Sequence, residues 1–161
     1  MIEHPIEPVY DANSKVLILG SFPSVKSRES GFFYGHPQNR FWKVLAAITG
    51  QEVPQTVAEK KAFLLKNRIA VWDVIQSCTI TGSSDSSIKD VVANDLSRIL
   101  DSAVIRQIYV NGRKAEQLYQ KYIYPQTGME AVCLPSTSPA NAAWNLERLV
   151  DVWREIAQYF D

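Results

Sequence analysis

The sequence lacks the features that mark membrane, secreted and metal-binding proteins. No apolar run approaches the ~20 residues needed to span a bilayer, which argues against a transmembrane helix. The first residues, Met1 to Pro5, have neither the basic nor the apolar region of a secretory signal peptide. The only two cysteines, Cys78 and Cys133, have no metal-binding or redox spacing. We therefore expect two reduced thiols in a cytoplasmic protein without membrane association.

An excess of charge of one sign is also missing. The 17 basic and 17 acidic residues cancel, which argues against a protein that coats nucleic acid electrostatically. The sequence contains no G-x-x-x-x-G-K-[ST], G-x-G-x-x-G or G-x-S-x-G motif. These absences argue against a P-loop nucleotidase, a dinucleotide-binding enzyme and a serine hydrolase.

What is present is an alternation of short apolar runs and amphipathic segments. The 161 residues, 46% hydrophobic and 21% charged, suit one globular domain spanning 1–161. Strands alternating with helices predict an α/β fold, three-layer α/β/α, with a mainly parallel four-stranded sheet. The expected strands are 15–19, 69–73, 105–110 and 131–134. The expected helices are 41–49, 56–66, 91–100, 115–124 and 141–160.

In such a fold, ligands bind beyond the carboxyl ends of the strands. The segments after the expected strands are 20–39, 73–77, 111–114 and 134–141. The first and last of these combine proline, serine and small residues, which form rigid turns that present backbone N–H groups. We expect both loops on the same edge of the sheet.

An aromatic segment that begins in the first of these loops and runs into the next expected helix, Gly31 to Trp42, is the strongest functional signal. Phenylalanine, tyrosine and tryptophan stand there beside glycine and proline, which punctuate loops rather than element interiors. Large flat side chains next to polar donors suit a flat ligand, and a nucleobase is the natural candidate.

The sequence around these residues resembles a known family. Gly20-Ser21-Phe22-Pro23-Ser24 and the segment Gly31 to Trp42 look like the first active-site motif of the uracil-DNA glycosylase superfamily. Leu134-Pro135-Ser136-Thr137-Ser138-Pro139-Ala140-Asn141 looks like its second motif, a loop that enters the duplex. Within the superfamily, the resemblance is greatest to the hypoxanthine-DNA glycosylase (DNA-deoxyinosine glycosylase) family.

This resemblance implies an enzyme of DNA repair. Its members hydrolyse the N-glycosidic bond of a deaminated base in double- or single-stranded DNA, release the base and leave an abasic site. They need no metal and no other cofactor. The base must leave the stack before a side chain can reach it. We expect a monomer.

Two residues of the aromatic segment receive the main roles by this resemblance. Asn39 is the catalytic candidate, since its amide can orient water through its oxygen and donate through its NH₂ group. Without the resemblance, we would interpret Asn39 as the cap of a helix beginning near Arg40. Tyr34 takes the place of an aromatic residue that stacks on the base. At least one of Phe32 and Phe33 is expected in the core.

The sequence also departs from the wider superfamily. Phe22 stands where many relatives have Asp or Asn, and Leu134 stands where many have His or Asn. Both departures remove groups that activate water or stabilise charge, which weakens the case for uracil excision and favours the hypoxanthine branch. A uracil or G:T/U mismatch glycosylase is the alternative. A non-catalytic nucleotide- or DNA-binding α/β domain is a further alternative.

The remaining candidates are assigned by motif. Asp73 ends the second strand, where relatives recognise the base edge; a helix cap or a solvated strand end is equally open for it. His36 contacts phosphate or forms a turn ahead of Pro37. The other residues expected at the base are Gly20, Ser21 and Phe22. Those expected at DNA, besides His36, are Ser24, Leu134, Pro135, Ser136, Thr137, Ser138 and Pro139.

Overall fold

The computed structural model describes residues 1–160 and has a four-stranded parallel sheet at its centre. The strands lie in the order β3-β2-β6-β7 and are β2 (Val16–Gly20), β3 (Ile69–Asp73), β6 (Gln107–Asn111) and β7 (Ala131–Leu134). Every residue of β2 and β3 is buried, because helices cover both faces of a parallel sheet. The expected three-layer α/β/α fold is confirmed.

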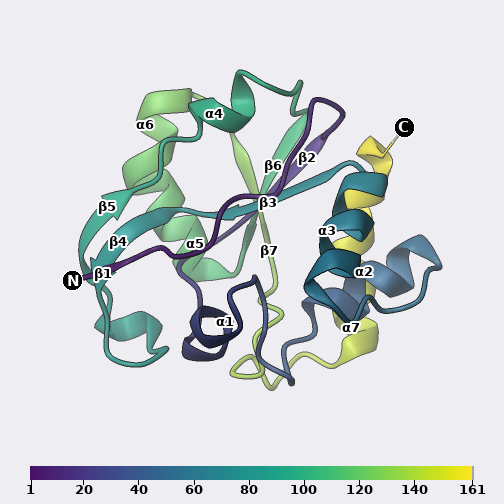
Figure 1. The fold of residues 1–161 in the computed structure, drawn as a ribbon, viewed down its shortest axis with the longest axis horizontal. Helices are drawn as coiled ribbons and strands as arrows, with labels where there is room; N and C mark the ends of the chain where they lie inside the picture. Colours follow the sequence, from purple (N-terminus) through teal and green to yellow (C-terminus); the bar gives the residue numbers. More distant parts are fainter. Residues whose placement is uncertain (161) are drawn as a thin grey trace.

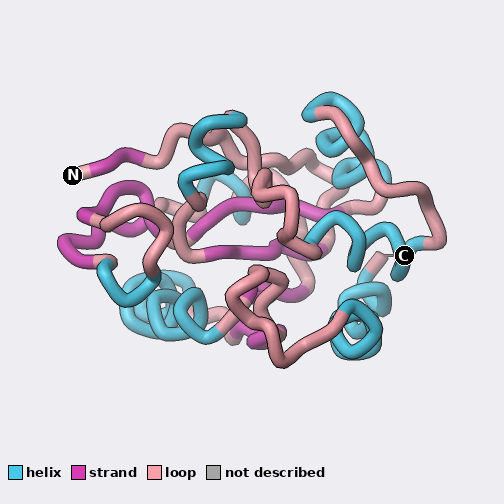
Figure 2. The backbone as a smooth tube through the Cα atoms, turned by 90° about the horizontal axis from the view of Figure 1, so that it is seen from below, coloured by secondary structure: helices cyan, strands magenta, loops and turns pink. Residues whose placement is uncertain are grey.

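The helices form two layers, one on each side of the sheet (Figures 1 and 2). On one side lie α2 (Phe41–Thr49), α3 (Val57–Lys66) and α7 (Leu146–Trp153), which a 3₁₀ turn (Arg154–Tyr159) extends. On the other side lie α5 (Arg113–Leu118), a π-helical turn (Tyr119–Ile123) and α6 (Tyr124–Thr127). The short helices α1 (Val25–Ser30) and α4 (Ser97–Leu100) complete the set, with a 3₁₀ turn at Asp85–Ser87. None of the helices within residues 1–160 is long and apolar enough to cross a membrane.

A second, antiparallel sheet was not predicted. It contains β1 (Ile2–Glu3), β4 (Ile75–Thr79) and β5 (Lys89–Ala93), in the order β1-β4-β5. The prediction of a helix over 91–100 is wrong in its first half, because residues 89–93 pair with β4 and only 97–100 are helical. Val91 and Val92 are β-branched and suit a strand, and the pairing with β4 overrides the local helical spacing.

The last helix also begins later than predicted. Helix α7 starts at Leu146, and the Asn145 side chain caps it by accepting a hydrogen bond from the N–H of Arg148 at 2.9 Å. Residues 141–145 therefore remain in the loop that follows β7, at the edge of the sheet where the ligand was expected.

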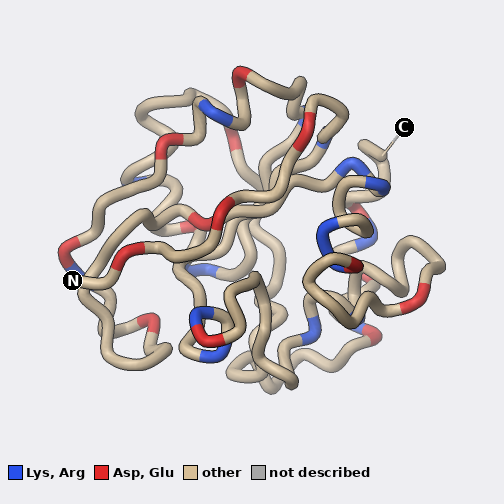
Figure 3. Tube along the Cα trace, in the orientation of Figure 1, with Lys and Arg blue, Asp and Glu red and all other residues tan. Residues whose placement is uncertain are grey.

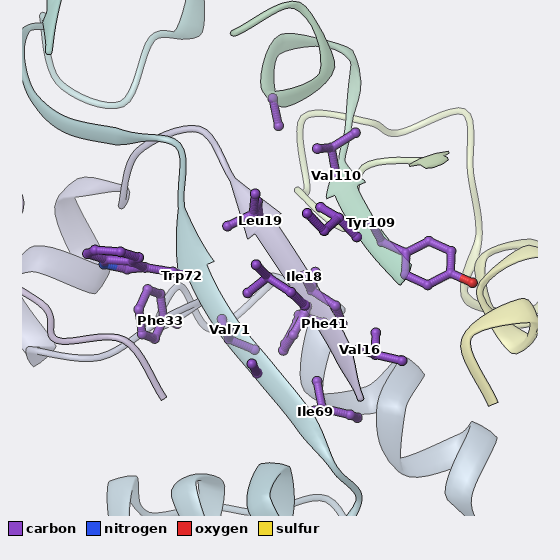
Figure 4. Close-up of a cluster of buried hydrophobic side chains, with 14 of the residues drawn as sticks. Val16, Ile18, Leu19, Phe33, Phe41, Ile69, Val71, Trp72, Tyr109 and Val110 are labelled. Carbon is purple, nitrogen blue, oxygen red and sulfur yellow. The ribbon is translucent and has the colours of Figure 1, made fainter. Parts of the chain in front are cut away.

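The core fills the space between the sheet and its helices. Figure 4 shows Phe33 and Phe41 from the aromatic segment among side chains of β2 and β3, and both rings are buried. Phe32 and Trp42 are buried as well, so most of the aromatic residues in this segment are core residues. Tyr34 is the exception among them, being only half-buried.

Candidate active site

A pocket of about 430 Å³ lies where the strands of the central sheet end. The loops after β2 and β7 meet at this edge, at the bottom of Figure 1. The walls include residues 20–24 at the end of β2, Asp73 at the end of β3, Asn111 at the end of β6, and residues 136–138 with Ala140 after β7. The predicted location at the carboxyl edge is therefore confirmed.

Asp73 is held at the wall of this pocket by His4, a residue outside both predicted motifs. The Nε2 atom of His4 lies 2.7 Å from Oδ2 of Asp73, and both side chains are almost fully buried. The Nδ1 atom of His4 accepts a hydrogen bond from the N–H of Ile6 at 3.2 Å. Since Nδ1 accepts, the ring proton sits on Nε2 and is donated to Asp73.

Gly20 makes room for this carboxylate. Gly20 and Asp73 are paired across β2 and β3, and a Cβ atom on Gly20 would lie 2.5 Å from Oδ1 of Asp73 and 3.1 Å from the Tyr34 hydroxyl. Any side chain at position 20 therefore displaces the Asp73 carboxylate. The glycine of the first motif is needed for close approach and not for a turn.

Tyr34 places its hydroxyl next to the same carboxylate. Its backbone has a φ of 51°, which non-glycine residues rarely adopt. Its ring stacks on Phe41 with a centroid distance of 3.9 Å, so one face of the ring is already covered. The hydroxyl is buried and makes no hydrogen bond of good geometry within residues 1–160. Burial and the charge of Asp73 raise the pKa of Tyr34, while the nearby Asn111 amide opposes them, so the hydroxyl stays protonated as a donor.

Asn39 also lines the pocket, immediately before helix α2. Its Oδ1 atom accepts a hydrogen bond from the N–H of Phe41 at 2.9 Å. This bond is an Asx turn that satisfies the first N–H of α2, so Asn39 caps the helix from one residue before its N-cap position, Arg40, and the bond fixes which end of the amide is oxygen. The Nδ2 group makes no hydrogen bond within the described chain and remains available as a donor.

Arg40 fastens the loop after β7 to this helix. Its backbone N–H donates to the carbonyl of Thr137 at 3.1 Å. Its guanidinium donates to the carbonyls of Ser138 at 2.8 Å, of Asn141 at 3.1 Å and of Trp144. One side chain therefore satisfies several carbonyls of a loop without regular secondary structure, and joins the two motifs.

We expect Arg40→Met to lower the free energy of unfolding by about 2–4 kcal/mol, because hydrogen bonds to a charged group contribute about 1.5–3 kcal/mol each and the carbonyls lose their donors. Urea denaturation measures the difference. Arg148→Met is the control: this exposed arginine in the first turn of α7 donates to one carbonyl of the same loop, that of Ala143, and lies over the Trp144 ring, so its loss should cost less than about 1 kcal/mol. Equal losses in the two variants would contradict the tether.

Two residues predicted to touch DNA are buried instead. Leu134 is 1% exposed, and Thr137 is fully buried at the wall of the pocket. Asn111 donates through Nδ2 to the Thr137 hydroxyl at 3.0 Å, and accepts from the Thr137 N–H at 3.1 Å. Leu134 therefore packs in the core at the end of β7, and Thr137 anchors the loop to β6, while the assignment of both residues to DNA binding stays a prediction.

The hydroxyls of the two motif loops serve local turns. Ser24 caps α1 by accepting from the N–H of Ser27 at 3.2 Å. The Ser136 hydroxyl accepts from the N–H of Ser138, and the Ser138 hydroxyl accepts from the N–H of Ala140. Neither caps the final helix, which has Asn145 at its start. The three serines predicted to touch DNA therefore shape the loops around the pocket.

Other predicted residues occupy the rim. His36 accepts from the N–H of Gln38 at 3.1 Å through Nδ1, which is its turn role and leaves Nε2–H as a donor. Phe22 packs edge-on against His4 with a centroid distance of 5.8 Å. Pro135 accepts through its carbonyl from the indole N–H of Trp153 at 2.9 Å. Half-buried residues of the rim include Ser21, which lines the pocket, and Pro139.

One wall of the pocket was not foreseen. Ile80 and residues 83–86, from the loop between β4 and β5, line the pocket, and Arg28 holds this loop by donating to the carbonyl of Gly82 at 2.6 Å. Partial burial raises the pKa of Asp85 in this loop, while Lys114 and the Ser21 hydroxyl oppose that shift. The sequence showed this stretch only as a serine-rich exposed loop, with no signal that it folds over a ligand site.

The surface around the pocket carries charges of both signs. Figure 3 shows basic and acidic residues interspersed along the chain, and helix α1 beside the pocket contains both. No three His, Cys, Asp or Glu side chains of the described residues converge on a point that could hold a metal ion. Cys78 and Cys133 are free thiols, as expected.

A parallel sheet with a pocket at its carboxyl edge, lined by two motif loops, is the architecture that the sequence resemblance implied. The model of the Uracil DNA glycosylase superfamily matches residues 7–157. The chain therefore belongs to the uracil DNA glycosylase superfamily.

Two curated relatives are named more narrowly. A protein from Methanosarcina acetivorans called hypoxanthine DNA glycosylase is 38% identical over 92% of this chain and 94% of its own length. One from Methanosarcina barkeri with the same name is 36% identical over 83% of this chain and 85% of its own length. The solution NMR structure of a candidate uracil DNA glycosylase from M. acetivorans superposes with a TM-score of 0.81, at 34% identity and 99% coverage of both chains. The predicted family and the enzyme class, a DNA glycosylase, are confirmed.

Proposed function

We propose that this DNA glycosylase releases hypoxanthine from deoxyinosine and leaves an abasic site in DNA. The observation that carries this proposal is the pair formed by the Asp73 carboxylate and the Tyr34 hydroxyl, both adjacent to Gly20 in the pocket. The names of the curated relatives support the same substrate.

The pair is complementary to a deaminated base. Asp73 can only accept a hydrogen bond when ionised, and the protonated Tyr34 hydroxyl is free to donate one. Hypoxanthine presents the matching edge, with N1–H as donor and O6 as acceptor. Adenine presents the opposite polarity, an acceptor at N1 and a donor at N6. Deamination thus replaces an acceptor at N1, which the Asp73 carboxylate repels, by an N1–H donor, which hydrogen-bonds to it.

Asn39 is the residue that assists cleavage of the N-glycosidic bond. Hydrolysis passes through an oxocarbenium-like sugar while the bonding electrons move onto the departing base. The free Nδ2–H of Asn39 donates to this developing negative charge, and the second lone pair of its Oδ1 orients the attacking water. Water adds to C1′ of the sugar, and its proton leaves with the base. The helix cap holds the amide in place for both tasks.

The loops on the rim receive the DNA. The flipped base must cross an opening formed by the first-motif loop and the segment after β7, where Ser136, Ser138 and Pro139 are accessible. Their backbone groups and the Nε2–H of His36 face phosphates in this proposal. Extruding a base costs a few kcal/mol in duplex DNA and less in a single strand, so both forms are substrates.

A substrate comparison tests the proposal. Uracil offers an N3–H and a carbonyl in the same arrangement within a smaller ring, so it is the second candidate base. We expect single-turnover release of hypoxanthine from deoxyinosine to be more than about tenfold faster than release of uracil from deoxyuridine, a difference of about 1.4 kcal/mol. A duplex with deoxyxanthosine completes the series. A preference for deoxyuridine by the same factor would overturn the substrate assignment while leaving the family intact.

A further inference from the structure

The buried contact between His4 and Asp73 has no role in the chemistry described so far. The two residues are 69 positions apart, yet Nε2 and Oδ2 approach to 2.7 Å with side chains only 3% and 5% exposed. A polar pair this deep must be hydrogen-bonded to be tolerated, and here each partner satisfies the other.

The imidazole is held from every side. Strand β1 pairs with β4, and the N–H of His4 donates to the carbonyl of Gln76 at 2.6 Å, which brings the residue beneath the end of β3. Phe22 meets the ring edge-on, and Phe33 lies at a centroid distance of 5.9 Å. The N–H of Ile6 fixes the tautomer through Nδ1. These contacts fix the position of the ring and leave Nε2–H as its only N–H donor.

The geometry points to His4 as a positioning residue for base recognition, and this inference rests on the proposed function. The Nε2–H group occupies Oδ2 of Asp73 and so stops the carboxylate from rotating. Oδ1 is then the atom left against Gly20 and the pocket, where it accepts the N1–H of the base. His4 lies before residue 7, where the superfamily match begins, so the N-terminal segment supplies part of this site.

The effect of His4 is therefore specific to a base with a proton on N1. Without the histidine, the carboxylate can rotate, and its second oxygen is buried without a partner, which costs about 1–3 kcal/mol. A base without N1–H never used Oδ1, so its binding is insensitive to how Asp73 is held. A merely structural role of His4 would instead affect both bases alike.

Three variants separate these cases. His4→Phe retains a ring between Phe22 and Phe33 but has no donor. His4→Gln carries an amide nitrogen as many bonds from Cβ as Nε2 and can donate to Asp73. His4→Asn is one carbon shorter and cannot reach. The Gln and Asn variants form a matched pair of amides, so the comparison survives even where the Phe variant fails to fold.

The readout is binding to two duplexes by fluorescence anisotropy. One contains 2′-fluoro-deoxyinosine, whose fluorine slows hydrolysis, and the other 2′-fluoro-deoxynebularine, whose purine lacks both N1–H and O6. We expect the Phe and Asn variants to weaken binding of the inosine duplex by about 10- to 100-fold, with less than about threefold change for the nebularine duplex. The Gln variant should restore most of the difference.

Equal losses on both duplexes, or no loss in the Phe and Asn variants, would overturn the role of His4. Base release by the wild-type enzyme from unmodified deoxyinosine is measured in parallel. If that release is absent, the proposed function fails, whatever the binding ratios show. The two failures are thus distinguished by separate measurements on the same protein.

Discussion

Replacing Asn39 by alanine is expected to lower the single-turnover rate of hypoxanthine release by about 10²- to 10³-fold, the usual effect of removing one donor to developing charge. The Nδ2 group of Asn39 lines the pocket without a partner in the described chain, whereas its oxygen already serves the N–H of Phe41. Binding to a deoxyinosine duplex should be retained. Rates at saturating enzyme measure the first effect, and anisotropy measures the second.

Asn39→Asp is the matched control for the helix cap. Its carboxylate still accepts from the N–H of Phe41 and suits the N-terminus of α2, so the free energy of unfolding should not fall. It lacks the NH₂ donor and places negative charge beside the departing base. We therefore expect release as slow as in the alanine variant. If Asn39→Asp releases hypoxanthine at the wild-type rate, Asn39 serves only to cap the helix and the proposed catalytic role is wrong.

Replacing Asp73 by asparagine is expected to reverse the polarity of the pocket. His4 continues to donate to the oxygen at this position, so the NH₂ group of the new side chain takes the place of Oδ1. A donor then faces the N1–H of hypoxanthine. We expect the ratio of the affinity for a deoxyinosine duplex to that for a deoxyadenosine duplex to fall by about 100-fold. One charge-assisted hydrogen bond is lost, and the NH₂ group and N1–H are then two donors that face each other.

Asp85→Asn makes the same chemical change on the rim of the same pocket. Asp85 lies in the exposed loop between β4 and β5, near Lys114 and Ser21, and the proposed recognition of the base does not use it. The ratio between the two duplexes should stay within about threefold of wild type. A comparable fall in both variants would mean that net charge, rather than the hydrogen bond of Asp73, sets the preference.

The parts of the site that follow a strand directly could be predicted from the sequence. Buried parallel strands appear as continuous apolar runs, so the ends of β2 and β3 at Gly20 and Asp73 were visible. The carboxyl-edge rule then placed the loops after β2 and β7 at one edge. The competing roles of Asn39 were also recognised, and the structure shows that its cap leaves one end of the amide free.

The second sheet was missed for a physical reason. Strands β4 and β5 pair with register shifts between Ile75 and Ser77 and between Ser77 and Thr79, so their alternation of buried and exposed residues is irregular. In the sequence, residues 91–100 have a spacing that also fits a helix. Tertiary pairing decided between the two, and with it the position of the loop 80–86 over the pocket.

The sequence by itself determined the layered fold, the edge that bears the pocket and the motifs of its family. These depend on local apolar runs and on short contiguous segments, which can be read residue by residue. Only the tertiary structure decided how Asp73 is held, because His4 reaches it from 69 positions away by way of β1. It alone showed that Arg40 fastens the second loop and that Leu134 and Thr137 are buried. Contacts between distant segments depend on how the whole chain packs, so the local sequence around either partner does not predict them.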